Sequence, residues 1–226
     1  MLLLHINGAL LEMNEEAIHL LYEGDAEEAI STLLSCLEGA REPFFQNSSS
    51  EERTGLSAHL EAIPLGGVLG SEDSIDDYEI EYFGFYRYAF TADKSRVVLS
   101  WGNQGWFCFR AAVAFNLALI YHHQGLVNAD LPVLSQAVSM YHLGLDFVEL
   151  AKDLDDSGIN NLRLALYNNL GHVYSFLGDG EGVKNCREGL QTELQKTRPD
   201  CSTGAFFRRS LTSAREYNVI PWAPVA

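Results

Sequence analysis

The sequence predicts an all-α fold, an array of antiparallel helical hairpins interrupted by a loop and β-hairpin insert. Three observations support this prediction. Small residues recur at one spacing in three segments, a glycine follows each expected first helix, and one intervening segment places aromatic residues at alternate positions. The chain has 226 residues, of which 47% are hydrophobic and 20% charged, so it carries enough apolar surface for a folded core.

Residues 1–42 are expected to form the first hairpin, a degenerate copy of the repeated pattern. Ala17 takes the small-residue position of the first helix, Gly24 marks the turn, and Ala29 takes the small position of the second helix. Acidic residues follow the turn, where they favour the start of a helix. The copy is weaker than the later ones, but it keeps their spacing.

Residues 43–105 are expected to form an insert of loops and a β-hairpin. The first part is rich in serine, glycine and acidic residues, a composition typical of loops. Residues 78–90 then carry aromatic side chains at alternate positions, which is the pattern of a strand. A turn at residues 93–95 would let residues 97–99 return as the second strand of the hairpin.

Residues 106–200 contain two further copies with a lengthened central pair of helices. In the upstream copy Ala118 takes the small-residue position and Gly125 the turn, and in the downstream copy Gly171 takes the small-residue position. The two copies lie farther apart than the ~34 residues of a regular helical-hairpin repeat. We expect the surplus to enlarge the turn after Gly125 and to lengthen the two helices that meet near residues 155–158.

Residues 201–226 comprise a capping helix and a tail. The helix is expected over residues 203–217, with Phe206, Phe207 and Leu211 facing inward. The tail contains two prolines, which cannot continue the helix.

The repeated pattern resembles the tetratricopeptide repeat over residues 10–42 and 106–197. The clearest match is residues 167–174, where Leu170 and Gly171 stand between two aromatic residues. We expect a neighbouring helix to approach the backbone at Gly171, because glycine has no side chain. The positions expected to pack the repeats are Ala17, Ala29, Ala118, Tyr121, Ala137, Gly144, Leu170, Gly171 and Tyr174.

The resemblance also implies a peptide-binding groove along the first helices. In the tetratricopeptide family, the asparagine that matches Asn116 and Asn169 hydrogen-bonds the backbone of an extended peptide. The alternative is an amide that is bonded within its own repeat, since buried amides are normally paired either way. The expected groove residues are Asn116, Asn169, Phe115, Leu119, His122 and His172.

The groove positions favour an apolar or basic protein or peptide partner. The family's carboxylate-binding groove needs lysine and arginine on the first helices, but the corresponding positions here are Asn14, Ile18, Phe115, Leu119, Asn168 and His172. The formal net charge is −16, from 15 Lys+Arg against 31 Asp+Glu. That charge argues against nucleic acid and against an anionic membrane surface as partners, because both would be repelled.

The sequence predicts a non-catalytic interaction module without a cofactor or a metal, because the common catalytic motifs are absent. Two alternatives remain. One is a metal-binding or enzymatic protein that uses His122, His123, His142 and His172, although their spacing matches no ligand motif. The other is an obligate oligomer, or a self-associating subunit, that packs through its aromatic insert at residues 82–90.

The sequence also predicts an intracellular, cytoplasmic protein. The apolar N-terminus lacks the basic residues of a signal peptide. The longest apolar run, residues 106–121, is too short and too polar for a membrane span. Four scattered cysteines form neither a disulfide framework nor a zinc motif, and they are Cys36, Cys108, Cys186 and Cys201.

Overall fold

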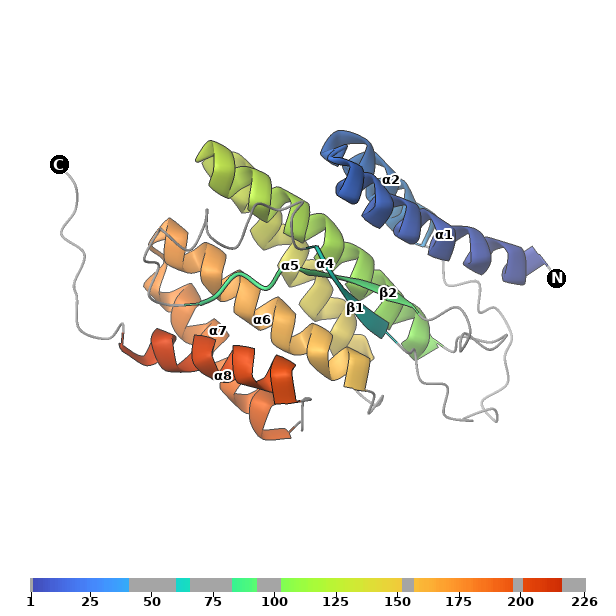
Figure 1. Ribbon diagram of the computed structural model, residues 1–226. Coiled ribbons are helices and arrows are strands. Elements are labelled where there is room, and N and C mark those ends of the chain that lie inside the picture. Colours follow the sequence, from blue (N-terminus) through green and yellow to red (C-terminus); the bar gives the residue numbers. More distant parts are fainter. Residues whose placement is uncertain are drawn as a thin grey trace.

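The protein folds as packed pairs of antiparallel helices with one two-stranded sheet (Figure 1). The predicted all-α class with a small β element is confirmed. The predicted tail, residues 218–226, lies outside the described residues. The computed structural model describes residues 2–40, 60–65, 83–92, 103–151, 157–196 and 201–216.

Within the described residues, three helical hairpins follow one another, and α8 packs against the last of them. The second helix of each hairpin contacts the first helix of the next, so the hairpins stack in chain order (Figure 1). The bounds of α1, α2, α4, α5, α6, α7 and α8 are Leu2–Glu23, Ala26–Gly39, Asn103–Asn128, Leu131–Leu150, Ser157–Leu177, Gly180–Lys196 and Cys201–Glu216.

The turns inside the hairpins follow glycine and aspartate residues of the sequence. Gly24 and Gly178 have φ angles of 86° and 72°, in the left-handed region that glycine reaches at low cost. The side chains of Asp25, Asp130 and Asp179 each accept a hydrogen bond from the backbone N–H three residues further on. These N-caps satisfy donors that a helix start leaves unpaired.

The turn of the second hairpin differs from the prediction of an enlarged turn after Gly125. Helix α4 continues to Asn128, and only Ala129 and Asp130 separate it from α5. Ala129 adopts the left-handed conformation, with φ of 50°, that glycine adopts in the other two hairpins. Gly125 instead serves packing, because a Cβ there would lie 2.6 Å from Leu134 Cγ. The surplus residues therefore lengthen the helix and not the turn.

The sheet also differs from the predicted local hairpin. Strand β2 (Tyr88–Ala92) overlaps only the end of the strand expected within residues 78–90, since residues 83–87 are not strand, and it pairs antiparallel with β1 (Leu60–Pro64), which lies in a region expected to be loop. The predicted return strand, residues 97–99, lies outside the described residues. A pairing between segments so far apart in sequence leaves no local turn signal to read.

Residues 83–92, which we name the central segment, run across the helical array. Figure 1 shows this segment passing over α6 and α4, and its strand β2 contacts α1 and α4. Phe83, Tyr86 and Phe90 are 1%, 3% and 1% exposed. These three rings therefore pack inside their own chain, whereas Tyr88 of the same segment is 39% exposed.

The closing helix α8 agrees with its predicted position. Phe207 is fully buried, and Phe206 and Leu211 are half-buried against the core. The Tyr86 ring centroid lies 5.4 Å from that of Phe206 and 5.0 Å from that of Phe207. Helix α8 thus covers one end of the central segment.

The predicted repeat-packing residues lie in the core or at its edge. Most are buried, and Tyr121 and Tyr174 are half-buried against the core. A Cβ at Gly144 would lie 2.7 Å from Leu166 of α6, so α5 and α6 approach closely there. The buried members are Ala17, Ala29, Ala118, Ala137, Gly144, Leu170 and Gly171.

The described helices and thiols match two further expectations. No helix among the described residues is long and apolar enough to span a bilayer. Cys36, Cys108 and Cys186 are buried free thiols. Burial raises the pKa of Cys36 and of Cys186 to about 12, with Asp179 adding to the effect at Cys186, so both thiols stay protonated at neutral pH.

Candidate functional site

Two asparagines, on the first helices of the second and third hairpins, hold the central segment by its backbone. The Asn169 Oδ1 accepts a hydrogen bond from the Tyr86 N–H at 2.9 Å, and its Nδ2 donates to the Tyr86 carbonyl at 3.0 Å. Asn116 makes the same pair of bonds to Phe90, both at 2.8 Å. Each side-chain amide thus takes the place of a neighbouring strand in a sheet.

Two more asparagines extend this contact at either end. Asn14 of α1 donates to the Phe90 carbonyl at 3.1 Å and accepts a hydrogen bond from Asn116 Nδ2 at 3.0 Å. Asn168 of α6 donates to the Gly84 carbonyl at 2.6 Å. We name the surface formed by these four amides the asparagine face, and its members are Asn14, Asn116, Asn168 and Asn169.

The amides of the asparagine face are fully buried, which makes their pairing energetically important. A buried amide without partners costs about 1–3 kcal/mol. The central segment supplies a main-chain partner to each of the four amides, although Asn168 Oδ1 has no hydrogen-bond partner among the described residues, and the bonded groups of the segment are satisfied away from water. The fold therefore requires an extended chain at this position.

Gly171 lies beneath the first aromatic residue of the central segment. A Cβ at Gly171 would stand 2.6 Å from the Phe83 ring, so the missing side chain makes room for phenylalanine. The expectation of a neighbouring helix at Gly171 is wrong. The sequence pattern indicates a close contact at the backbone of Gly171, but it does not identify the residue that makes this contact.

Phe85 and Phe90 of the central segment have separate partners. The Phe85 ring centroid lies 4.3 Å from that of His122 and 5.7 Å from that of His172. Phe90 meets Phe115 edge to face at 5.2 Å between centroids. Such ring pairs add stabilisation beyond the burial of their area.

His122 and His172 form a buried hydrogen-bonded pair within a longer chain of polar groups. His122 Nε2 lies 2.9 Å from His172 Nδ1, His122 Nδ1 lies 3.0 Å from the Tyr141 hydroxyl, and Asn169 Nδ2 donates to that hydroxyl at 3.3 Å. Two proton orders satisfy these bonds: either the hydroxyl donates to His122 Nδ1 and His122 Nε2–H donates to His172 Nδ1, or His172 Nδ1–H donates to His122 Nε2 and His122 Nδ1–H donates to the hydroxyl oxygen. Both imidazoles are neutral, and the hydroxyl is protonated, in either order.

The surroundings keep this histidine pair neutral. Burial lowers the pKa of His122 well below its usual value, and the charges of His172 and His123 lower it further. Burial, together with nearby Arg87, lowers the pKa of His172 to about 4. Burial also raises the pKa of the Tyr141 hydroxyl, which therefore stays protonated as either proton order requires.

The four histidines of the metal-binding alternative do not come together. His142 Nε2 lies 2.7 Å from the Tyr174 hydroxyl and so belongs to a different contact. His123 lines a cleft beside Leu21 and Val127, between the first hairpin and the end of α4. Among the residues that the structure describes, no group of three or more histidine, cysteine, aspartate or glutamate side chains is placed to hold a metal ion.

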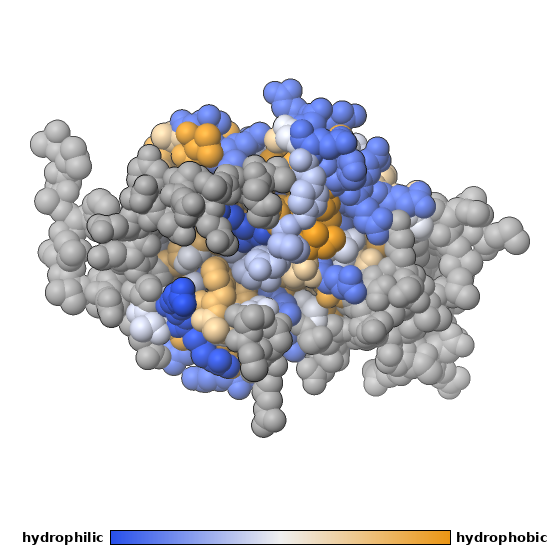
Figure 2. All heavy atoms as spheres, in the orientation of Figure 1, coloured by the Kyte–Doolittle hydropathy of each residue, from blue (hydrophilic) through white to orange (hydrophobic). Residues whose placement is uncertain are grey.

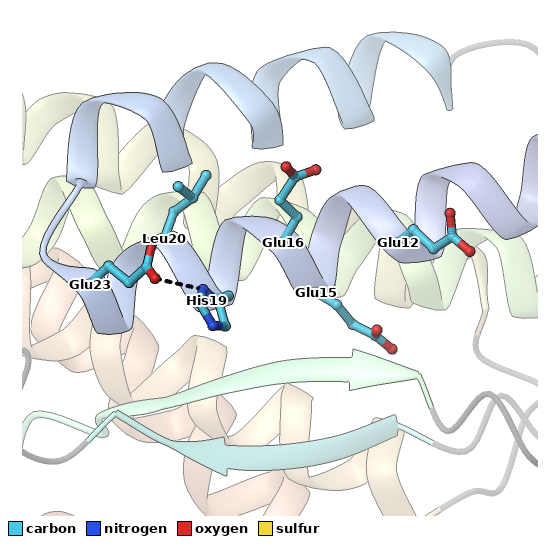
Figure 3. Close-up of a pocket in the computed structure, with 6 residues that line it drawn as sticks. All are labelled: Glu12, Glu15, Glu16, His19, Leu20 and Glu23. Carbon is cyan, nitrogen blue, oxygen red and sulfur yellow. Dashed lines mark ion pairs between the residues drawn. The ribbon is translucent and has the colours of Figure 1, made fainter.

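Helix α1 presents an acidic surface beside the sheet. Figure 3 shows an open hollow along this helix, with Glu15 and His19 pointing toward the strands and Glu16 pointing toward α2. His19 Nδ1 lies 3.5 Å from a Glu23 carboxylate oxygen, and both side chains are largely exposed. Hydrophilic side chains gather over the same part of the molecule in Figure 2. This hollow contributes to the negative field of the protein.

The structure places five of the six predicted groove residues, all except Leu119, in contact with the central segment of the same chain. Asn116 and Asn169 bind backbone as the resemblance implies, but that backbone belongs to the same chain. The alternative of bonding within one repeat holds only for one contact, because Asn168 Nδ2 also donates to Asn169 Oδ1 at 3.1 Å. Leu119 is buried in the core.

Sequence reasoning noted Asn14 and Asn168 only as non-basic positions and missed their part in the asparagine face. The only signal was that each is an amide on a first helix, at a position that the resemblance assigns to the groove. No local signal marks the central segment as their partner, because it lies 76 residues from Asn14 and 84 from Asn168 along the chain.

Comparison with known proteins adds no relative to this description. No protein-family model matches the chain. No curated protein and no solved structure matches it either.

Proposed function

We propose that this protein is a non-catalytic, tetratricopeptide-like interaction module that binds an extended protein segment on its asparagine face. The observation that carries the proposal is the pair of bonds that each of Asn116 and Asn169 makes to one residue of an extended chain. These hydrogen bonds involve only main-chain N–H and C=O groups, which any extended peptide presents. A segment from another protein offers the same main-chain groups, although it must compete with a segment that is covalently attached.

The proposed partner is apolar or basic. The asparagine face carries no basic side chain, and the central segment bound to it supplies aromatic rings and Arg87. The net charge of −16 favours encounter with such a segment by long-range attraction. Three buried free thiols suit a reducing compartment, so we place the module in the cytoplasm.

The central segment would compete with any partner for the asparagine face. The test must therefore allow this segment to be released from the face. Sites for a specific protease are introduced within residues 70–76 and 95–99 of the full chain, and the purified protein is cut at both. A labelled peptide with the sequence of residues 81–94 is then added in excess, and binding is followed by fluorescence anisotropy. We expect the peptide to exchange into the cut protein, which should remain helical by circular dichroism.

The matched control is the same cut protein carrying Asn116→Ala and Asn169→Ala. Each substitution removes two bonds to the peptide backbone, and we expect at least a tenfold loss of affinity, since about 1.4 kcal/mol corresponds to a factor of ten. A cut, folded protein that never takes up the peptide would contradict the proposed function.

A further inference from the structure

The asparagine face holds an extended chain in one direction. Tyr86 is bound by Asn169 of the third hairpin, and Phe90 is bound by Asn116 of the second. The central segment therefore runs opposite to the order of the hairpins. Because N–H and C=O point in defined directions from each residue, a chain of the reverse direction would not place the same groups opposite the same amides.

Besides these hydrogen bonds to the backbone, side chains and backbone of the helices contact aromatic rings at four positions of the central segment. The ring of Phe83 occupies the space over Gly171, and the ring of Phe85 lies against the histidine pair. Tyr86 packs against Phe206 and Phe207 of α8, and Phe90 against Phe115 of α4. The first, third, fourth and eighth residues of the segment are therefore specified by ring contacts.

The second position of the segment is restricted to a small residue. A Cβ at Gly84 would lie 3.2 Å from the Phe206 ring, tighter than ordinary contact. The Gly84 N–H donates to Ser210 Oγ at 3.2 Å, and its carbonyl accepts from Asn168 at 2.6 Å. Both main-chain groups are thus engaged between α6 and α8, and the backbone cannot move away from Phe206 without breaking a bond.

We propose that the asparagine face binds, in a partner protein, an extended segment of the pattern aromatic-small-aromatic-aromatic-x-x-x-aromatic, with the central segment as its built-in competitor. The inference rests on the proposed function and adds to it the sequence and the direction of the ligand. Any incoming chain must satisfy the same buried amides and fill the same ring contacts that the central segment now fills. The competitor keeps the face covered when no partner is present.

The test uses the cut full-length protein and four synthetic peptides of equal length. The first has the sequence of residues 81–94, and the second has that sequence in reverse order. The third replaces all four specified aromatic residues by leucine, and the fourth replaces only the residue matching Gly84 by valine. We expect the first peptide to bind at least tenfold more tightly than each of the others, measured by anisotropy.

The outcomes separate the two proposals. If no peptide binds to the cut, folded protein, the proposed function fails. If all four bind within a factor of two, the peptide-binding function stands and the inferred pattern and direction are overturned. The reversed peptide is the sharpest control, because it keeps composition, charge and aromatic content.

A second measurement on the intact, uncut chain tests the competitor role. Amide hydrogen exchange is followed at Tyr86 and Phe90, whose N–H groups bond the asparagines. We expect these amides to exchange at least tenfold faster than the slowest amides of α4 and α6, because the segment leaves without global unfolding. If the Tyr86 and Phe90 amides instead exchange as slowly as the slowest amides of α4 and α6, the segment leaves only on global unfolding, and its role as a competitor is overturned.

Discussion

At the scale of single residues, the asparagine face is where a polar side chain decides how two distant parts of the chain meet. Asn116 bonds both the N–H and the C=O of Phe90, inside a helix whose neighbouring residues are apolar. Its burial is tolerable only because both halves of the amide are paired. If the amide is removed, the N–H and C=O groups of Phe90 lose this hydrogen-bond partner and remain buried away from water.

We therefore predict that Asn116→Ala and Asn169→Ala, each as a single substitution in the intact chain, lower the free energy of unfolding by about 1–3 kcal/mol. Urea unfolding followed by circular dichroism measures the loss. The control is Gln136→Ala, which truncates an exposed amide on α5 and should change stability by less than about 0.5 kcal/mol. Equal effects at Asn116 and Gln136 would contradict the structure.

The histidine pair makes the stability of the protein depend on pH in a defined direction. The pKa of His172 is about 4 in the folded protein, and an unfolded histidine has a pKa of about 6.5. Below pH 6.5 the unfolded state therefore binds more protons than the folded state does. The contribution of His172 is complete above pH 6.5 and is lost as the pH falls toward 4.

We predict that His172 alone lowers the free energy of unfolding by about 2 kcal/mol between pH 7 and pH 5. The measurement is urea unfolding at pH 7, 6 and 5. His172→Phe keeps a ring beside Phe85 but removes the titrating group, so its stability should fall less steeply. His19→Gln, at an exposed position on α1, should retain the slope of the unsubstituted protein.

At the scale of elements, contact between α6 and the central segment depends on the absence of a side chain. Gly171 is an interior residue of α6, where alanine would ordinarily be the better helix former by about 1 kcal/mol. The Phe83 ring occupies the place of its Cβ. Close packing therefore outweighs helix propensity at this position, because a displaced ring would lose contacts along the face.

We predict that Gly171→Ala lowers the free energy of unfolding by about 1–3 kcal/mol, despite the gain in helix propensity. Gly8→Ala is the matched control, because a Cβ at Gly8 of α1 meets no described atom within 4 Å. The Gly8→Ala substitution should raise the free energy of unfolding by about 0.5–1 kcal/mol. The combination of Gly171→Ala with Phe83→Leu should lower the free energy of unfolding by less than the sum of the two single effects. Strict additivity would show that residues 171 and 83 are not in contact.

At the scale of the whole molecule, charge repulsion opposes the packing of the hairpins. The chain carries a net charge of −16, and exposed glutamates lie on both α1 and α2. Like charges one turn apart on a helix destabilise it by a few tenths of a kcal/mol per pair. Salt screens these interactions over a Debye length of about 10 Å at 0.1 M.

We predict that raising sodium chloride from 10 mM to 200 mM increases the free energy of unfolding by about 1 kcal/mol, because it screens this repulsion. Urea is the denaturant of choice, since it adds no ions. The double variant Glu12→Gln/Glu16→Gln should respond less to salt. A stability that falls with salt would indicate that ion pairs, and not repulsion, dominate the surface.

The sequence by itself determined the helical hairpins, their order, the closing helix and the polar residues that matter. These features are encoded locally: Gly24 and Gly178 end helices through their left-handed conformation, and Asn116 and Asn169 are conspicuous amides in apolar helices. The periodicity of a helix repeats every few residues, so a single chain displays it.

Only the tertiary structure decided what the asparagines hold. The pairing of β1 with β2, the Phe83 ring over Gly171 and the His122–His172 bond each join residues far apart in sequence. A small or polar residue in a helix indicates that a partner is needed, and many partners meet that need. The partner that is present in the folded protein depends on the packing of the whole chain. Every buried amide must be hydrogen-bonded and every ring must be packed in the same arrangement.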